Sequence, residues 1–220
     1  MTPEALMLFA AGFGTRMGTL TAARPKPLIE VAGRPLIDHA LALTQGLRVV
    51  VNTHYHADQI AAHLAGRGVA ISHEPAILDT GGGLKAALPV LGGGAVFTLN
   101  SDAVWAGPNP LGVLRAAWRP GMAALLLLVP RARVRGRDGP GDARIDAGGR
   151  LIWGGDMVYS GAQIIDPAPL ADIPGAAFPM HRLWDRAAGA IHAVPYRGLW
   201  CDVGHPGGIA AAEAMLAEHP

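Results

Sequence analysis

Apolar runs of strand length alternate with amphipathic stretches along the first hundred residues of the chain. A short apolar run between turn residues predicts a buried strand, whereas apolar residues at a spacing of three and four predict a helix. The pattern predicts strands over 5–11, 47–52, 69–72 and 95–99. It predicts helices over 35–45, 57–64 and 84–91, and Pro89 should bend or end the last of these.

The second half of the chain is less regular, although apolar runs continue. They predict strands over 122–129, 157–165, 191–195 and 199–203, and helices over 180–188 and 208–218. The segment 131–149 is rich in Arg, Gly and Asp, which indicates a hairpin or a mobile loop. The alternation of strands and helices predicts an α/β fold, a Rossmann-like α/β/α sandwich with a mixed, mainly parallel central sheet. No Pro/Ser-rich linker divides residues 1–220, so we expect a single domain.

Composition and charge exclude several classes of protein. Half of the residues are hydrophobic, 16% are charged and the formal net charge is +1, a balance that is not typical of a disordered chain. No run of Lys or Arg indicates a nucleic-acid surface, and the chain has only two lysines, Lys26 and Lys85. The apolar run 125–129 is far shorter than the roughly 20 residues of a membrane span. With a single cysteine, Cys201, we expect a cytoplasmic protein without disulfides and without a membrane partner.

A glycine loop follows the first predicted strand, in the segment Leu8-Phe9-Ala10-Ala11-Gly12-Phe13-Gly14-Thr15-Arg16-Met17. Gly12 and Gly14 free the backbone to turn and to bring N–H groups close to a ligand, an arrangement that suits phosphate oxygens. Arg16 adds a permanently charged group that can bind phosphate through two N–H donors. Further along, Pro25 and Pro27 flank Lys26 and should hold its backbone extended, so that the ammonium group is aimed.

The spacing Gly12-x-Gly14 is also found in dinucleotide-binding loops. The third glycine of that fingerprint would fall at Met17, and the acidic residue expected after a second strand is absent. A dinucleotide-dependent oxidoreductase is therefore the less favoured interpretation. The glycine loop, then Leu20-Thr21 and Pro25-Lys26-Pro27-Leu28, resembles instead the signature of the sugar-1-phosphate nucleotidyltransferases, or nucleoside-diphosphate-sugar pyrophosphorylases.

This resemblance implies roles for the loop residues. Arg16 and Lys26 would contact the triphosphate and the transferred phosphate, as catalytic residues. Ala10, Ala11 and Gly12, together with Gly14, would contact the nucleotide. The resemblance also divides the chain into a nucleotide-binding half, 1–105, and a sugar-binding half, 106–220.

Three consecutive glycines stand in the segment Asp79-Thr80-Gly81-Gly82-Gly83. Because glycine costs backbone entropy on folding, such a run needs a reason, and a flat surface for a nucleotide base would provide one. The resemblance places Thr80 and Gly81 against the base, with Glu74 nearby. The alternative is a flexible helix N-terminus without a ligand.

Asn100-Ser101-Asp102 ends a strand that should lie in the middle of the sheet. Ligands of such sheets bind beyond the carboxyl ends of the strands, and Mg²⁺ prefers one or two carboxylates plus phosphate oxygens and water. Asp102 is therefore a candidate catalytic metal ligand, with a simple helix-capping role as the alternative. The stretch Cys201-Asp202-Val203-Gly204-His205 resembles the family's second metal motif, so Asp202 would complete the Mg²⁺ site. Ser101 and His205 replace the Gly and Thr usual in the family, and Ser101 could crowd the nucleotide.

The acceptor side is assigned by resemblance too. Tyr159-Ser160-Gly161 is similar to the element that contacts the sugar, which implies that Tyr159, Gly161 and the strand-end Asn100 bind substrate. The lysine that many relatives use for the sugar phosphate is absent, and His181 or Arg182 could replace it. The compact length resembles the uridylyltransferases of bacterial cell-wall recycling, which implies UTP and N-acetylmuramate-1-phosphate as substrates and Mg²⁺ as cofactor. Glucose- or mannose-1-phosphate with UTP or GTP, and a non-catalytic nucleotide-sugar sensor, are the alternatives.

Overall fold

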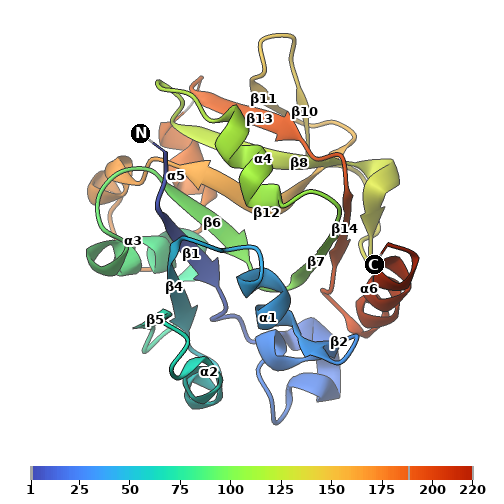
Figure 1. The fold of residues 1–220 in the computed structure, drawn as a ribbon. Helices are drawn as coiled ribbons and strands as arrows, with labels where there is room; N and C mark the ends of the chain where they lie inside the picture. The colour runs from blue at the N-terminus through green and yellow to red at the C-terminus, as the bar shows by residue number, and fades with distance from the viewer. Residues whose placement is uncertain (1, 188, 220) are drawn as a thin grey trace.

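A nine-stranded mixed sheet forms the centre of the protein (Figure 1), whose computed structural model describes residues 2–187 and 189–219. Four neighbouring strands are parallel: β5 (Ala70–His73), β4 (Arg48–Thr53), β1 (Ala5–Phe9) and β6 (Val96–Asn100). The sheet then reverses, because β12 (Met157–Ile165) runs antiparallel to β6 and to β8 (Ala124–Pro130). Beyond them lie β13 (Ile191–Pro195), parallel to β8, and the hairpin of β10 (Ala143–Ile145) and β11 (Leu151–Trp153).

Helices cover both faces of this sheet, and the alternation along β1 shows why. Leu6 and Leu8 pack in one core cluster and Ala5 and Met7 in another, so each face of the strand is buried. The first cluster includes residues of α1 (Leu36–Leu41), α2 (Ala57–Leu64) and α4 (Pro110–Ala117). The second includes residues of α3 (Asp79–Leu91) and α5 (His181–Arg186). The expected mixed α/β sandwich is confirmed.

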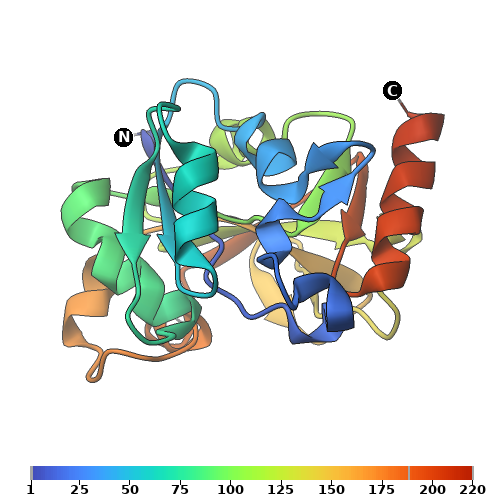
Figure 2. The ribbon, with the colours of Figure 1, turned by 90° about the horizontal axis from the view of Figure 1, so that it is seen from below.

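A smaller sheet carries the last helix. It has the order β7-β14-β9, formed by β7 (Ala103–Ala106), β14 (Leu199–Asp202) and β9 (Val134–Arg135). The helix α6 (Pro206–Glu218) packs beside β14, at the opposite end of the molecule from β5 and α2 (Figures 1 and 2). Short elements complete the chain: β2 (Glu30–Val31), β3 (Arg34–Pro35) and the 3-10 turns η1 (Thr15–Thr21), η2 (Lys26–Leu28), η3 (Arg131–Arg133) and η4 (Ala168–Asp172).

Several boundaries differ from the prediction. The helix expected over 35–45 begins at Leu36 and ends at Leu41, because Pro35 belongs to the β2–β3 hairpin. The helix expected from residue 84 begins at Asp79, and Pro89 lies in its last turn without ending it. The segment 131–149, expected to be a hairpin or a mobile loop, contains η3, β9 and β10, and β10 forms a hairpin with β11. The expected end of α5 at Ala188 lies outside the described residues. Within the described residues, none of the helices combines the length and apolar character needed to cross a membrane.

Candidate active site

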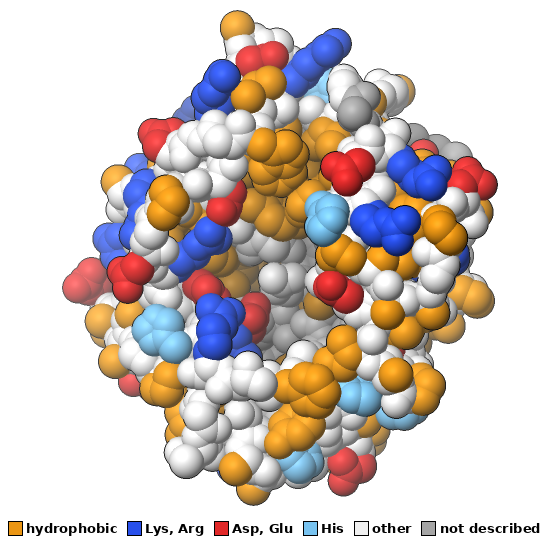
Figure 3. Space-filling model, turned by 180° about the vertical axis from the view of Figure 1, so that it is seen from behind, with side chains coloured by type: hydrophobic (Ala, Val, Ile, Leu, Met, Phe, Trp, Pro, Cys, Tyr) orange, Lys and Arg blue, Asp and Glu red, His pale blue; other side chains and the backbone are white. Residues whose placement is uncertain are grey.

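A cavity of about 400 Å³ opens at the carboxyl ends of β1, β4 and β6, where an α/β sheet is expected to bind its ligand. The space-filling view shows it as a hollow with basic and acidic side chains gathered on one side (Figure 3). Its volume falls within the range of small-molecule sites. Most of the predicted nucleotide and catalytic residues line it, namely Ala10, Ala11, Gly12, Gly14, Arg16, Lys26, Glu74, Thr80 and Asp102, together with the predicted substrate residue Asn100.

The glycine loop forms one edge of the cavity. Gly14 has φ +65, and its carbonyl accepts hydrogen bonds from the Met17 N–H (2.9 Å) and the Thr21 hydroxyl (3.2 Å). A Cβ at this position would lie 2.9 Å from the Cβ of Lys26. Glycine is therefore required both by the backbone conformation and by the close passage of the Lys26 segment. Arg16 follows at the exposed rim.

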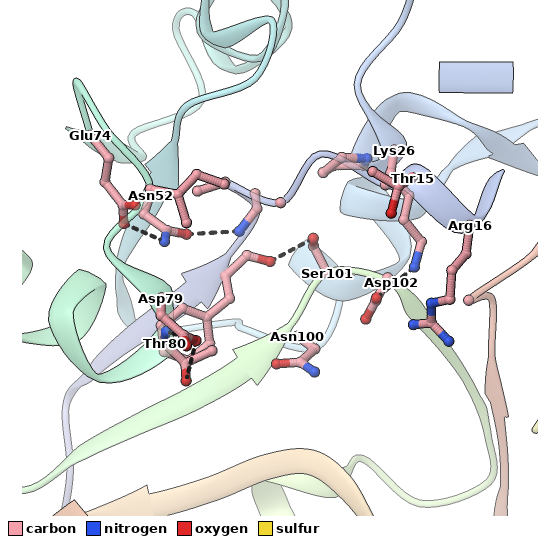
Figure 4. A pocket seen from close by; sticks show the side chains of 18 residues that line it. Thr15, Arg16, Lys26, Asn52, Glu74, Asp79, Thr80, Asn100, Ser101 and Asp102 are labelled. Atoms are coloured by element: carbon pink, nitrogen blue, oxygen red, sulfur yellow. Dashed lines mark hydrogen bonds and ion pairs between the residues drawn. The ribbon is translucent and has the colours of Figure 1, made fainter. Parts of the chain in front are cut away.

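Lys26 reaches into the cavity from beneath this loop. Pro25 is extended, with ψ 145, but Lys26 itself begins the turn η2, so the expected extended backbone is confirmed only as far as Pro25. The side chain is 9% exposed, and its Nζ lies 2.6 Å from Oδ2 of Asp102. Figure 4 shows Arg16, Lys26 and Asp102 together on one side of the cavity. The ammonium group therefore has a fixed direction, as predicted, but the ion pair with Asp102 fixes it.

Strand pairing brings the two candidate metal ligands together. The strands β7 and β14 are antiparallel with Ala103 opposite Asp202, and the Val203 N–H donates to the Asp102 carbonyl at 3.0 Å. Burial raises the pKa of the Asp202 carboxyl, and the Asp102 charge raises it further. The charges of Lys26, Arg16 and Arg137 oppose this rise. Asp102 and Asp202 are therefore close enough to repel each other.

The donor set fits Mg²⁺ better than a transition metal. In the described part of the chain, His, Cys, Asp and Glu nowhere form a group of three or more that could hold a metal ion. A pair of carboxylates suits a hard cation that completes its coordination with phosphate oxygens and water. A divalent cation would also relieve the repulsion between Asp102 and Asp202. The residues present therefore fit a cation that arrives with a polyphosphate.

A buried amide and carboxylate form the opposite side of the cavity (Figure 4). Asn52, at the end of β4, accepts the Ala10 N–H at 2.8 Å and donates to Oε1 of Glu74 at 2.7 Å. The other carboxylate oxygen of Glu74 accepts the Leu78 N–H at 3.0 Å, and the residue is 1% exposed. Both oxygens of Glu74 are thus engaged within the protein, so the residue predicted to lie near the base holds Asn52 in place.

The glycine run lies inside the first turns of α3. The N–H groups of Gly81 and Gly82 both donate to the Phe178 carbonyl at 3.0 Å. A Cβ on Gly81 would lie 2.6 Å from the Phe178 ring, and one on Gly83 would lie 2.6 Å from Oε1 of Glu74. Close packing against Phe178 and Glu74 therefore requires glycine at these positions. This reason differs from the expected one, a flat surface for a nucleotide base. Thr80 lines the cavity, whereas Gly81 is not among the described residues that do so.

The predicted sugar-binding residues are on β6, β12 and α5. Gly161, at φ +78 within a register shift of β12, lets the chain pass Asn100, because a Cβ there would lie 2.6 Å from the Asn100 Nδ2. The Tyr159 ring packs edge-on against Trp184 with centroids 5.4 Å apart, and burial raises the pKa of its hydroxyl above the usual range. His181 is exposed at the start of α5. Of these predicted residues, Asn100 alone lines the cavity in the described structure.

Sequence reasoning missed some residues of the site. Asn52 carried a signal, since it ends an apolar, β-branched strand as Asn100 does. Arg137, whose charge opposes the rise in the pKa of Asp202, lies in the segment predicted to be a hairpin or a mobile loop. Ser101 turns its hydroxyl to the Phe9 carbonyl at 2.7 Å and ties β6 to β1. His205 is exposed at the N-cap of α6.

The fold, and a cavity in which Arg16 and Lys26 lie beside Asp102, are those expected of a nucleotidyltransferase. The chain belongs to the family described as the MobA-like NTP transferase domain, which matches residues 6–213, and it is a sugar-1-phosphate nucleotidyltransferase of that family. It is 42% identical to an N-acetylmuramate alpha-1-phosphate uridylyltransferase of Caulobacter vibrioides, over 98% of each chain.

Solved structures share the fold. A putative glucose-1-phosphate thymidylyltransferase from Bacillus anthracis, in complex with a sucrose, has a TM-score of 0.81 at 16% identity, covering 98% of this chain and 96% of that one. HddC from Yersinia pseudotuberculosis, complexed with GMP-PN, has a TM-score of 0.76 at 19% identity, covering 97% of this chain and 99% of that one. At these identities the likeness concerns the fold alone.

Proposed function

We propose that this enzyme transfers UMP from UTP to N-acetylmuramate-1-phosphate and releases pyrophosphate. The observation that carries the choice of substrates is the 42% identity to the Caulobacter vibrioides uridylyltransferase, which extends over 98% of both chains. The cavity supports the reaction class, because one side carries Arg16 and Lys26 and the other carries the Asn52–Glu74 pair. The polyphosphate would lie against the first side and the nucleoside against the second.

The reaction is an in-line displacement at the α-phosphorus. An oxygen of the sugar phosphate forms the new bond, and the bond from the α-phosphorus to the bridging oxygen breaks, so that pyrophosphate leaves with the electron pair. A phosphate oxygen is already anionic near neutral pH, so no general base is needed. The main obstacle is the mutual repulsion of two polyanions, and catalysis consists chiefly of positioning and charge neutralisation. Arg16 would bind the β- and γ-phosphates, and Lys26 would bind the transferred phosphate.

Asp102 and Asp202 would hold Mg²⁺, which supplies positive charge and orients the phosphates when it is bound. Lys26 would then exchange its carboxylate partner, Asp102, for a phosphate oxygen. This exchange keeps the charge of the site nearly balanced before and after the substrate binds. We place the enzyme in the cytoplasm, where nucleoside triphosphates are made and a single buried thiol such as Cys201 stays reduced.

The test is a pyrophosphate-release assay with a matrix of substrates. The four nucleoside triphosphates are each combined with N-acetylmuramate-1-phosphate, glucose-1-phosphate and mannose-1-phosphate, with Mg²⁺ and with excess EDTA. We expect the highest kcat/KM for UTP with N-acetylmuramate-1-phosphate, no turnover in EDTA, and recovery when Mg²⁺ is restored. Preference for another pair would replace the proposed substrates, and tight nucleotide-sugar binding without turnover in any pair would indicate a sensor.

A further inference from the structure

The acceptor phosphate needs a cation that the two lysines do not supply. Lys26 lies on the nucleotide side of the cavity and is paired with Asp102. Lys85 is on α3, where it donates to the Ile173 carbonyl at 2.7 Å and lies over the Phe178 ring. A second phosphate dianion brought next to the triphosphate therefore requires an arginine or a histidine.

Arg137 is placed beside the catalytic carboxylates by strand pairing. The strand β9 runs parallel to β14 with Arg135 opposite Cys201, so the chain leaves β9 next to Asp202. Gly136 has φ +68, and a Cβ there would collide with the Asp202 carbonyl oxygen, so the backbone passes directly against the end of β14. Arg137 follows at once, one residue beyond the glycine that lies against the end of β14.

A second carboxylate fixes the direction of this guanidinium group. Nη2 of Arg137 lies 2.6 Å from Oδ1 of Asp142, and the other oxygen of Asp142 accepts the Tyr159 N–H at 2.8 Å. Through Asp142 the Arg137 side chain is therefore held next to the Tyr159 backbone, while the preceding residue, Gly136, lies against the Asp202 carbonyl. The two side chains of the ion pair are 32% and 28% exposed, so the pair contributes little to stability and its guanidinium remains open to a ligand.

We propose that Arg137 binds the phosphate of the sugar acceptor and that Asp142 is the positioning residue that holds it there. This inference rests on the proposed function, because that function places the α-phosphorus at Asp102 and Asp202 and the sugar near Tyr159. The attacking phosphate must lie between these two points, and the segment of Gly136 and Arg137 connects the end of β14 to the Asp142–Tyr159 contact. An arginine can offer two N–H donors to a phosphate, so one contact with Asp142 leaves donors for the acceptor.

The test compares Arg137→Ala with Arg133→Ala, which removes an exposed arginine from the same segment. With Arg137→Ala we expect KM for the sugar phosphate to rise about 10- to 100-fold, the usual loss for a charged hydrogen bond. KM for the nucleoside triphosphate should stay within about twofold, and Arg133→Ala should match the wild type in both constants. Arg137→Lys should recover part of the loss, because lysine keeps the positive charge but lacks the planar guanidinium group with its paired N–H donors.

Asp142→Asn tests the positioning role. Asparagine can still accept the Tyr159 N–H but no longer pairs its charge with Arg137, so we expect a smaller rise in the same KM and an unchanged unfolding midpoint. Equal KM values for Arg137→Ala and the wild type would overturn the proposal, and so would equal rises for both substrates.

A direct binding measurement keeps the proposal independent of turnover. N-acetylmuramate-1-phosphate is titrated calorimetrically into the wild type and Arg137→Ala, each with Mg²⁺ and a non-reacting UTP analogue. Weaker binding to Arg137→Ala than to the wild type would support the proposed role of Arg137, even if the wild type released no pyrophosphate. In that case only the proposed function would fail. Identical binding in the two proteins would refute the role of Arg137.

Discussion

Replacing Lys26 by methionine tests the central feature of the site, because methionine keeps much of the apolar stem and removes the charge. The lost ammonium lies 2.6 Å from Asp102 and faces the position proposed for the transferred phosphate. Removing one preorganised electrostatic partner of a transition state commonly costs about 10²–10³ in kcat, or about 3–4 kcal/mol. We expect a loss of this size for Lys26→Met.

The expected effect on stability is smaller. The Lys26 side chain is 9% exposed but that of Asp102 is 30% exposed, so the pair lies between a surface ion pair and a buried one. The first kind contributes about 0–1 kcal/mol, and breaking the second costs about 3–5 kcal/mol. We therefore expect Lys26→Met to lower the free energy of unfolding by about 1–2 kcal/mol. A domain with typical stability of about 5–15 kcal/mol would remain folded at 25 °C.

The assay pairs pyrophosphate release at saturating substrates with urea unfolding. Lys85→Met is the matched control, because it removes the other lysine and its hydrogen bond to the Ile173 carbonyl, away from the cavity. We expect the control to lose about 1 kcal/mol of stability and to keep kcat within about twofold of the wild type. A kcat for Lys26→Met within about threefold of the wild type would refute the electrostatic role of Lys26, whatever the change in stability.

Three further substitutions test a buried hydrogen bond, a buried hydroxyl group and a strained backbone position. Asn52→Ala should raise KM for the nucleoside triphosphate and cost about 1–3 kcal/mol, because it leaves the Ala10 N–H and Oε1 of the buried Glu74 without a partner; unchanged KM and stability would contradict this. Burial raises the pKa of Tyr196 to about 12, so the folded state keeps a proton that the unfolded state loses above about pH 10. Unfolding measured between pH 10 and 12 should therefore show stability falling by up to about 1.4 kcal/mol per pH unit from this residue, a slope that Tyr196→Phe should remove. Gly161→Ala should lower the unfolding midpoint, since φ +78 costs about 1–2 kcal/mol for alanine, and an unchanged midpoint would show that the backbone adapts.

Elements with a strong local pattern were predictable from the sequence. The strands 157–165 and 191–195 and the helix 57–64 have the bounds that their apolar runs indicate. The strand β7 and the helix α4 were not predicted, although the side chain of Asn109 caps α4 and Pro110 occupies its first turn. The signal for α4 is therefore local to the sequence. The strand β7, in contrast, depends on pairing with β14, almost a hundred residues away.

The candidate site shows the same division. Short sequence motifs indicate the chemistry of Arg16, Lys26 and Asp102 without information on distant parts of the chain. All three residues line the cavity. The function of Glu74 depends on Asn52, a hydrogen-bond partner on a neighbouring strand. The sequence therefore indicated where Glu74 lies but not that its carboxylate is hydrogen-bonded within the protein. Arg137 was hidden for a similar reason, because its position is set by the pairing of β9 with β14.

The pairing of β7 with β14 has a consequence for how the enzyme is made. Asp102 and Asp202 are a hundred residues apart, so a growing polypeptide exposes the glycine loop, Lys26 and Asp102 to solvent long before Asp202 leaves the ribosome. A partly synthesised chain thus holds an ammonium group and one carboxylate without the second. In the proposed mechanism, catalytic competence arrives only with the final strand and α6, which makes turnover a stringent reporter of complete folding.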